Sequence, residues 1–243
     1  MVIHLYTINS YEYVDYKKPN TILILHGWGC SINYMIQFKK EIHSSNLLFI
    51  DLPGFGNNPH LISPFNITDF SNTIITFLQT HNFDINYIVG HSFGGKIAIL
   101  IAKQLKIKCL FLIAPSIFHK RRFIIYYLKI YFYKIAKKIK LSKKVLNMFG
   151  SKDYKELTPV MKRTMSLVIN EDITLILESL KTPMVVFFGD KDTVTPLYLY
   201  KKIKKHAFDS TLIKLKGDHF AYLSNIKFIS NIIEGVINLW FLH

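Results

Sequence analysis

The sequence has few cysteines, few acidic residues and no long uncharged apolar segments. Its 243 residues include two cysteines, Cys30 and Cys109, too few for a disulfide framework and without metal-ligand spacing. No segment approaches the roughly 18 uncharged apolar residues of a membrane-spanning helix, and the first 18 residues lack the apolar core of a secretory signal. We therefore expect a protein of the reducing cytoplasm, with no bound metal and no cofactor.

The shortage of acidic residues is uneven along the chain. The sequence holds 31 Lys and Arg against 16 Asp and Glu, for a net charge of +15, and 14 of the basic but only 2 of the acidic residues lie between Phe118 and Met165. Such a cluster fits an acidic partner, a membrane surface or nucleic acid. No helix-turn-helix, RRM or zinc motif is present, so we expect no nucleic-acid partner. A compositional bias toward lysine is the alternative explanation, because Lys, Ile and Asn are abundant throughout.

Short apolar runs alternate with amphipathic helical patterns along most of the chain. The runs lack the polar alternation of a solvent-facing strand, as expected for strands buried on both faces of a parallel sheet. The predicted strands are Thr21–Leu25, Leu47–Ile50, Tyr87–Val89, Cys109–Ile113, Met184–Phe188 and Thr211–Leu215, and the predicted helices are Ile67–Thr80, Gly94–Leu105, Pro196–Ala207 and Ile226–Trp240. This order predicts a doubly wound α/β sheet with its ligand site at the carboxyl ends of the strands.

The alternation breaks between Ala114 and Pro183, where about 70 residues separate two predicted strands, far more than a crossover needs. We expect a helical cap, residues 116–180, inserted into a core of residues 1–115 and 181–243. In its first half, apolar residues recur at helical spacing (Ile125, Leu128, Phe132, Ile135 and Ile139) with lysines opposite. The pattern predicts a basic amphipathic helix whose apolar face covers the active-site cleft. Contact with a membrane surface is the less favoured alternative.

The heptapeptide VGHSFGG contains a G-x-S-x-G motif, Gly90 to Gly94, between a predicted strand and a predicted helix. In that context the motif is a nucleophile elbow, a turn so sharp that the residues two positions from the serine must be small. A plain turn is the competing interpretation. The placement favours Ser92 as a nucleophile.

A nucleophilic serine needs a base, and the base needs an orienting acid. His219 follows the last predicted strand in the run GDHF and is the expected base. Asp190 and Asp192 both follow the preceding strand in GDKDTVTP, and we choose Asp192 as the acid, with Asp190 bonding loop backbone. Asp218 adjoins the histidine and is expected to point away from the ring.

Acyl transfer also needs hydrogen-bond donors for the developing oxyanion. One is expected to be the backbone N–H of Phe93, directly after the nucleophile, and the other the backbone N–H of Trp28 in the loop LHGWGCS. Both residues are also expected to contact the substrate. His26 of the same loop is predicted to structure the loop instead of transferring protons.

Taken together, the runs HGWG, DLPGFG, GHSFGG, GDKDTVTP and GDHF resemble the α/β-hydrolase superfamily, in order and spacing, over nearly the whole chain. The resemblance implies an eight-stranded, mostly parallel sheet with helices on both faces and a cap inserted after the sixth strand. It also implies Ser92, Asp192 and His219 as a catalytic triad. The runs HGWG and DLPGFG are similar, more weakly, to the esterases that cleave pimeloyl-carrier-protein methyl esters.

The expected function is a serine hydrolase that cleaves a small-molecule carboxylic ester through an acyl-enzyme. Serine at position 92 argues against haloalkane dehalogenases and epoxide hydrolases of this fold, which use aspartate, and against dienelactone hydrolases, which use cysteine. One alternative is a hydrolase of a carrier-bound acyl ester or a thioester, with an acidic acyl carrier protein docking at the basic cap. Another is a non-catalytic ligand-binding member of the fold.

Overall fold

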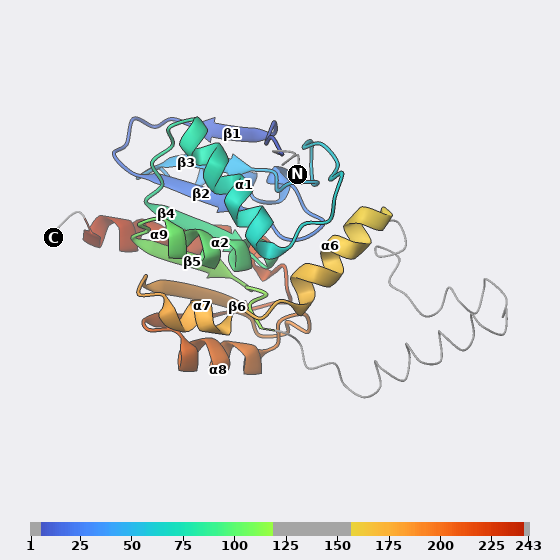
Figure 1. Ribbon diagram of the computed structural model, residues 1–243. Coiled ribbons are helices and arrows are strands. Elements are labelled where there is room, and N and C mark those ends of the chain that lie inside the picture. Colours follow the sequence, from blue (N-terminus) through green and yellow to red (C-terminus); the bar gives the residue numbers. More distant parts are fainter. Residues whose placement is uncertain (1–5, 119–156, 241–243) are drawn as a thin grey trace.

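A seven-stranded sheet with helices on both faces forms the centre of the computed structural model, which describes residues 6–118 and 157–240 (Figure 1). The strands are β1 (Tyr11–Val14), β2 (Thr21–Leu25), β3 (Asn46–Ile50), β4 (Tyr87–His91), β5 (Cys109–Ile113), β6 (Met184–Gly189) and β7 (Ser210–Leu215). Their order in space is β1-β3-β2-β4-β5-β6-β7. β1 pairs with β3 in antiparallel fashion and the remaining pairs are parallel, which confirms the predicted mostly parallel α/β sheet.

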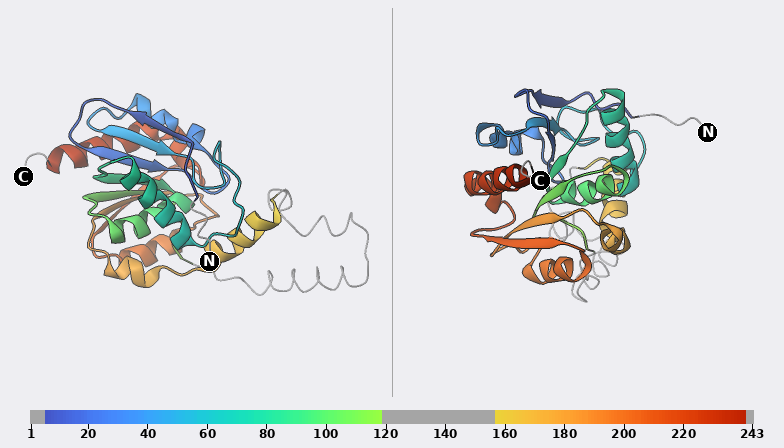
Figure 2. Two further views of the ribbon diagram at one scale, coloured as in Figure 1. Left: turned by 45° about the horizontal axis from the view of Figure 1, so that its top comes forward. Right: turned by 90° about the vertical axis from the view of Figure 1, so that its left-hand side faces the viewer.

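Helices cover the sheet on two sides (Figure 2). The described helices are α1 (Ile67–Thr80), α2 (Phe93–Gln104), α6 (Pro159–Asn170), α7 (Thr174–Ser179), α8 (Leu197–His206) and α9 (Ile226–Trp240), with 3-10 turns at η1 (Ile32–Tyr34), η2 (Ile36–Lys40) and η4 (Ala221–Ser224). Apolar residues of α1, α2, α7 and α8 share one core cluster, whereas those of α9 and η2 belong to a second cluster. The sheet therefore separates two apolar layers.

Strand β2 illustrates how the chain fills both layers. All five of its residues are buried. Leu23 and Leu25 belong to the cluster beneath α1 and α2, while Ile22 and Ile24 belong to the cluster beneath α9. Since successive side chains of a strand point to opposite faces, a continuous apolar run is what a strand covered on both sides requires.

The described residues contain seven strands instead of the eight expected, and the long insertion follows β5 instead of a sixth strand. The sequence did not predict β1, whose residues alternate between exposed and half-buried at the edge of the sheet. Just before it, the backbone N–H groups of Asn9 and Ser10 both donate to Oδ1 of Asn58, at 2.8 and 2.9 Å. Because a side chain takes these donors, the N–H groups of Asn9 and Ser10 are not available to a neighbouring strand.

Helix α6, in the second half of the predicted cap, is tied to the core by hydrogen bonds. The Lys96 ammonium, on α2, donates to the backbone carbonyls of Val168 and Glu171 at 2.8 and 2.5 Å. The N–H of Phe65 donates to Oγ1 of Thr164 at 3.1 Å. Burial lowers the pKa of Lys96 to about 8. The last carbonyls of a helix have no partner within the helix and lie at its negative end, so they suit a cation. The Lys96 ammonium therefore anchors the C-terminal end of α6 to α2.

The basic amphipathic helix predicted between Ile125 and Ile139 lies outside the described residues. The cap boundaries, 116 and 180, therefore stay a prediction. In the part of the chain that the structure describes, we find no helix with the length and apolarity needed to cross a membrane.

The parallel strands all end at one edge of the sheet, and the predicted site residues follow three of them. Ser92 comes after β4, Asp192 after β6 and His219 after β7. The chain crosses from β2 outward to β3 and later returns to β4 on the other side of β2, which creates a topological switch point. In open α/β sheets, ligands bind at such a point.

Candidate active site

Ser92 stands at the turn between β4 and α2 with a backbone geometry that few non-glycine residues adopt. Its φ is 50° and its ψ is −108°. A residue in this region costs free energy, so it persists only where its surroundings hold it. The Ser92 N–H donates to the carbonyl of Ile113 at 2.8 Å, and the Ser92 carbonyl accepts from the N–H of Ser116 at 3.0 Å. Strand β5 and the loop after it thus hold the turn that presents the Ser92 side chain.

The glycines on either side of Ser92 allow backbone segments to meet. A Cβ atom at Gly90 would lie 2.7 Å from the Cα of Gly95, and one at Gly94 would lie 2.5 Å from the carbonyl oxygen of His26. Real Cβ atoms do not approach other atoms so closely. The spacing of the G-x-S-x-G motif is therefore a steric requirement of this turn.

The side chains of Ser92, His219 and Asp192 form a hydrogen-bonded chain. Nε2 of His219 lies 3.0 Å from Oγ of Ser92, and Nδ1 of His219 lies 2.8 Å from Oδ2 of Asp192. Since an ionised carboxylate only accepts hydrogen bonds, Nδ1 carries the ring proton and Nε2 is free to accept from the Ser92 hydroxyl. The histidine side chain is 11% exposed and the aspartate side chain 0%, so solvent competes little for these bonds.

The carboxylate of Asp192 is satisfied at both oxygens. Oδ1 accepts from the backbone N–H groups of Val194 and Thr195 at 2.7 and 2.8 Å, and Oδ2 accepts from the Thr195 hydroxyl at 2.6 Å as well as from His219. Burial alone would raise the pKa of Asp192, but the hydrogen bonds from His219 and Thr195 outweigh burial and the pKa is lowered. The group is held as an anion facing the histidine.

The two other candidate aspartates point elsewhere. Asp190 accepts the N–H of Gly217 at 2.9 Å through Oδ1, and that bond lowers its pKa. Asp218 accepts the N–H of Phe220 at 2.9 Å. Each carboxylate therefore bonds loop backbone, and of the two acids after β6 the structure places Asp192 against the histidine.

The loop after β2 passes directly beside Ser92. A Cβ atom at Gly27 would lie 2.8 Å from Nδ1 of His91 and 3.4 Å from Cβ of Ser92, so this loop backbone is close to the serine. The neighbouring Trp28 is partly buried, and its ring centroid lies 5.3 Å from that of Phe93 and 4.9 Å from that of Phe55. Phe93 begins α2, where the first N–H groups have no partner within the helix. The structure thus brings both predicted donor residues to one place beside Ser92.

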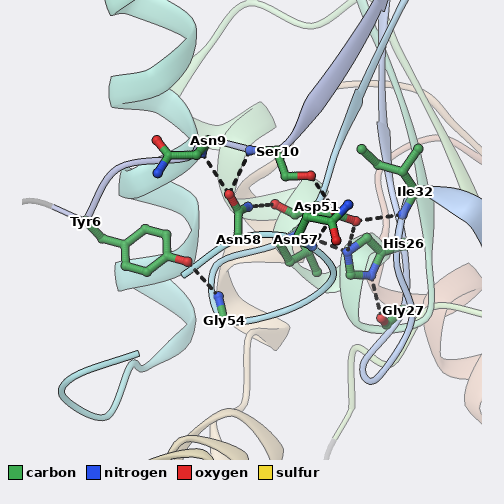
Figure 3. Close-up of polar contacts among 11 residues, drawn as sticks. Tyr6, Asn9, Ser10, His26, Gly27, Ile32, Asp51, Gly54, Asn57 and Asn58 are labelled. Atoms are coloured by element: carbon green, nitrogen blue, oxygen red, sulfur yellow. Dashed lines mark hydrogen bonds and ion pairs between the residues drawn. The ribbon is translucent and has the colours of Figure 1, made fainter. Parts of the chain in front are cut away.

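His26 and Asp51 both form hydrogen bonds with the backbone of the segment after β2 (Figure 3). The His26 ring donates from Nδ1 to the carbonyl of Gly27 at 2.7 Å and accepts at Nε2 from the N–H of Leu52 at 2.9 Å. Burial lowers the pKa of His26, which keeps the ring neutral. Both ring nitrogens are occupied by backbone groups, in agreement with the expectation that His26 structures the loop.

The sequence did not identify Asp51, in the run DLPGFG, as the centre of a second network (Figure 3). Its carboxylate accepts from the N–H of Ile32 at 2.7 Å, the hydroxyl of Ser10 at 2.6 Å and the N–H of Asn57 at 3.0 Å. These contacts join three loops that lie far apart in the sequence. The signal was the aspartate directly after a buried strand, where backbone donors converge.

His91, the residue before Ser92, is almost completely buried and contacts the backbone of the loop that carries His219. Its Nε2 lies 3.1 Å from the backbone carbonyl of His219, to which it donates. Burial, together with the nearby ring of His219, lowers the pKa of His91 to about 3. The ring is therefore neutral at ordinary pH.

Within residues 6–118 and 157–240, no three His, Cys, Asp or Glu side chains are grouped to hold a metal ion.

Comparison with known proteins gives matches to a family model, to curated proteins and to solved structures. A family model described as alpha/beta hydrolase fold matches residues 20–144, just over half of the chain. Over 102 residues the chain is 28% identical to the pimeloyl-[acyl-carrier protein] methyl ester esterase of Pseudoalteromonas atlantica, a match that covers 40% of this chain and 38% of that protein. The chain spans about two fifths of the length of the curated relatives it matches.

Solved structures match over nearly the full length. A lipase-esterase related protein from Clostridium acetobutylicum has a TM-score of 0.72 at 20% identity, with coverage of 93% of this chain and 98% of the other. An esterase from Exiguobacterium antarcticum has a TM-score of 0.73 at 14% identity, with coverage of 94% of each. At such identities the likeness establishes a common fold.

Proposed function

The chain belongs to the α/β-hydrolase fold family, and from this premise we propose that it is a serine hydrolase that cleaves carboxylic esters through an acyl-enzyme. One observation carries the proposal. The Ser92 hydroxyl, the His219 ring and the Asp192 carboxylate are linked by hydrogen bonds of 3.0 and 2.8 Å at the carboxyl edge of the sheet. This is the geometry that nucleophile, base and orienting acid need.

In the proposed reaction, Oγ of Ser92 forms a bond to the ester carbonyl carbon while Nε2 of His219 takes the hydroxyl proton. His219 then returns that proton to the alcohol oxygen as the carbon–oxygen bond breaks, and the acyl group stays on Ser92. Water attacks the acyl carbon and gives a proton to His219, which returns it to Oγ of Ser92 as the bond between Oγ and the acyl carbon breaks and the acid leaves. Asp192 holds the ring in the required tautomer and stabilises its transient positive charge.

The backbone N–H groups of Phe93 and Trp28 are proposed to bind the oxyanion of each tetrahedral intermediate. Support comes from the position of Phe93 in the first turn of α2 and from the close approach of the Gly27 backbone to Ser92. Such donors act without reorganisation because the turn and the loop are already held in place. The aromatic rings of Trp28 and Phe93, 5.3 Å apart, are proposed to contact the substrate.

Active-site labelling tests this function against the alternative of a non-catalytic binding protein. A fluorophosphonate probe should attach covalently to Ser92, because only a serine activated by a base attacks the phosphorus readily. Mass spectrometry should locate the adduct at Ser92, and the Ser92→Ala variant should remain unlabelled. A folded wild-type protein that neither labels nor hydrolyses any short p-nitrophenyl ester would exclude the esterase.

A second candidate is a hydrolase of a carrier-bound acyl ester or thioester. It is favoured by the similarity to the pimeloyl-[acyl-carrier protein] methyl ester esterase and by the excess of basic residues between Phe118 and Met165. Carrier proteins are acidic, so a basic cap, proposed to comprise residues 116–180, would attract them.

The free, buried state of both cysteines fits the proposed cytoplasmic location.

Salt dependence separates the two candidates. For an acyl group on an acidic carrier protein, kcat/KM should fall about tenfold or more between ~0.01 and ~0.15 M salt, as the screening length shortens from about 30 to about 8 Å. A neutral p-nitrophenyl ester of the same acyl chain is the control and should respond little. Equal salt responses of the two substrates would reject electrostatic recognition of a carrier.

A further inference from the structure

The loop that carries Asp192 also brings a hydroxyl to the same carboxylate. We propose that Thr195 is a positioning residue. Its hydroxyl, which Tyr200 holds in place, orients Asp192 and His219 and tunes how strongly His219 acts as a base. The proposal rests on the function proposed above, because it assigns a role within the same site. Neither residue bonds to the Ser92 hydroxyl, so their effect must pass through the carboxylate and the ring.

The direction of each hydrogen bond follows from its partners. Oγ1 of Thr195 lies 2.6 Å from Oδ2 of Asp192, and an ionised carboxylate only accepts, so the threonine proton points to Asp192. Tyr200 Oη lies 2.9 Å from the same Oγ1 and must therefore be the donor in that contact. Burial raises the pKa of Tyr200, which keeps its proton in place. The chain of donors thus runs from Tyr200 through Thr195 to Asp192.

The threonine oxygen also lies near the histidine ring itself. Oγ1 of Thr195 is 3.4 Å from Nδ1 of His219, whereas Oδ2 of Asp192 is 2.8 Å from that nitrogen. The ring N–H therefore points mainly at the carboxylate, with the threonine oxygen as a more distant acceptor beside it. A ring rotated away from Asp192 would lose the shorter of these contacts.

Tyr200 is a rigid support for this arrangement. It lies on α8 and is fully buried. Its ring stacks on that of Phe188, in β6, with centroids 4.6 Å apart and an interplanar angle of 28°. Since β6 leads into the loop that carries Asp192, this stacking fixes the Tyr200 hydroxyl relative to the strand that precedes the acid. Thr195 itself is 2% exposed, so water does not replace its hydroxyl easily.

Few charges compete with this network at the histidine. Asp192 faces Nδ1 of the ring, and the uncharged hydroxyl of Ser92 faces Nε2. His91, of β4, lies with its ring centroid 5.0 Å from that of His219 and is neutral at ordinary pH. The adjacent Asp218 bonds the Phe220 N–H. Among the described residues, Asp192 is thus the charged group to which His219 is hydrogen-bonded. The same Oδ2 atom of Asp192 accepts from both His219 and Thr195.

Removing the hydroxyl should have two effects. Without the Thr195 donor, the negative charge on Oδ2 is shared by one fewer hydrogen bond and stabilises a protonated His219 more strongly. The acid limb of the kcat/KM profile should then move to higher pH by about half a unit, since such a bond is a modest one. The carboxylate and the ring also lose a restraint, so the geometry for proton transfer worsens.

The experiment compares Thr195→Val, which keeps the shape but lacks the hydroxyl, with Thr195→Ser, which keeps the hydroxyl. On a short p-nitrophenyl ester, Thr195→Val should reduce kcat by about tenfold with KM within about twofold, since small misplacements of catalytic groups cost this much. Its acid limb should shift as described. Thr195→Ser should restore most of kcat and the wild-type pH profile. A valine variant with wild-type kcat and pH profile, or a serine variant as impaired as valine, would overturn the proposal.

Tyr200→Phe provides a second variant if Thr195→Val does not fold. It removes the donor that orients Thr195 and should shift the acid limb in the same direction by a smaller amount. A wild-type profile in folded Tyr200→Phe would overturn the support assigned to Tyr200.

Proton NMR separates this inference from the esterase function. The downfield signal of the His219 Nδ1–H, assigned by its loss in His219→Gln, should move in Thr195→Val and return in Thr195→Ser. If the wild-type protein hydrolyses no ester and does not label, the proposed function fails, and this comparison still decides the role of Thr195. An unmoved signal in the valine variant would show that the hydroxyl does not act on the histidine.

Discussion

Replacing Ser92 by alanine should reduce kcat/KM for a short p-nitrophenyl ester by roughly 10⁴- to 10⁶-fold, the range seen when a member of a catalytic triad is removed. Alanine lacks the oxygen that forms the bond to the acyl carbon, and the base then has no hydroxyl to activate. Any residual rate would come from substrate binding and the proposed oxyanion donors. The measurement is initial-rate kinetics with wild type and variant prepared in parallel.

The fold should survive this substitution. The hydrogen bonds that hold the turn use the backbone of Ser92, namely its N–H to Ile113 and its carbonyl to Ser116. Alanine retains both groups and adds no atom. Ser179→Ala is a matched control, because the Ser179 hydroxyl bonds the carbonyl of Ile176 on α7 and should leave the rate unchanged. A Ser92→Ala protein with full turnover would show that another group attacks the ester.

Replacing Gly94 by alanine should destabilise the protein by more than about 4 kcal/mol, which is exceptional for a single substitution. The added Cβ would lie 2.5 Å from the carbonyl oxygen of His26 and 2.6 Å from that of Leu25. Both atoms are backbone at the end of β2, a strand paired on both sides. Leu25 belongs to this paired strand and His26 follows it directly, so the backbone here has little freedom to move aside. Urea unfolding, or loss of soluble protein on expression, measures the effect.

Gly235→Ala is the control for this prediction. Gly235 lies within α9, and a Cβ built there meets nothing within 4 Å. Alanine is favoured over glycine in a helix by roughly 1 kcal/mol, so this variant should be as stable as the wild type or slightly more stable. If Gly94→Ala unfolded at the wild-type urea concentration, α2 could not pack as closely on β2 as described.

Most elements could be predicted from the chain because their signals are local. Helix α1 spans Ile67–Thr80 as predicted, and its start is marked by Asn66 and Asp69, whose side chains each accept the other's backbone N–H. The apolar runs predicted as strands agree with β2 to β7 within two residues at each end. Strand β1 was not predicted, because its residues do not form an apolar run and its position depends on pairing with β3.

The candidate site also contains some residues with local sequence signals and some contacts that depend on the fold. Ser92 and His219 could be selected from the sequence, since each stands in a short motif directly after a buried run. Asp190 and Asp192 are both in the loop after β6, and their difference depends on which carboxylate reaches His219 and which bonds Gly217. Asp192 was chosen from the sequence, but its contact with His219 arises from how this loop folds against the segment after β7, because His219 and Gly217 lie 27 residues beyond Asp192 and Asp190 respectively.

The amino-acid sequence by itself determined the alternation of buried strands and amphipathic helices, and the sharp turn at Ser92, because periodicity and small residues act over a few positions. Only the tertiary structure decided which groups meet at the carboxyl edge. The contacts of His219 with Ser92 and with Asp192, and the contact of His91 with the carbonyl of His219, join segments that lie 27 to 128 residues apart in the sequence and are brought together by the sheet. Hydrogen bonds depend on distances of tenths of an ångström, and such distances are set by packing between elements.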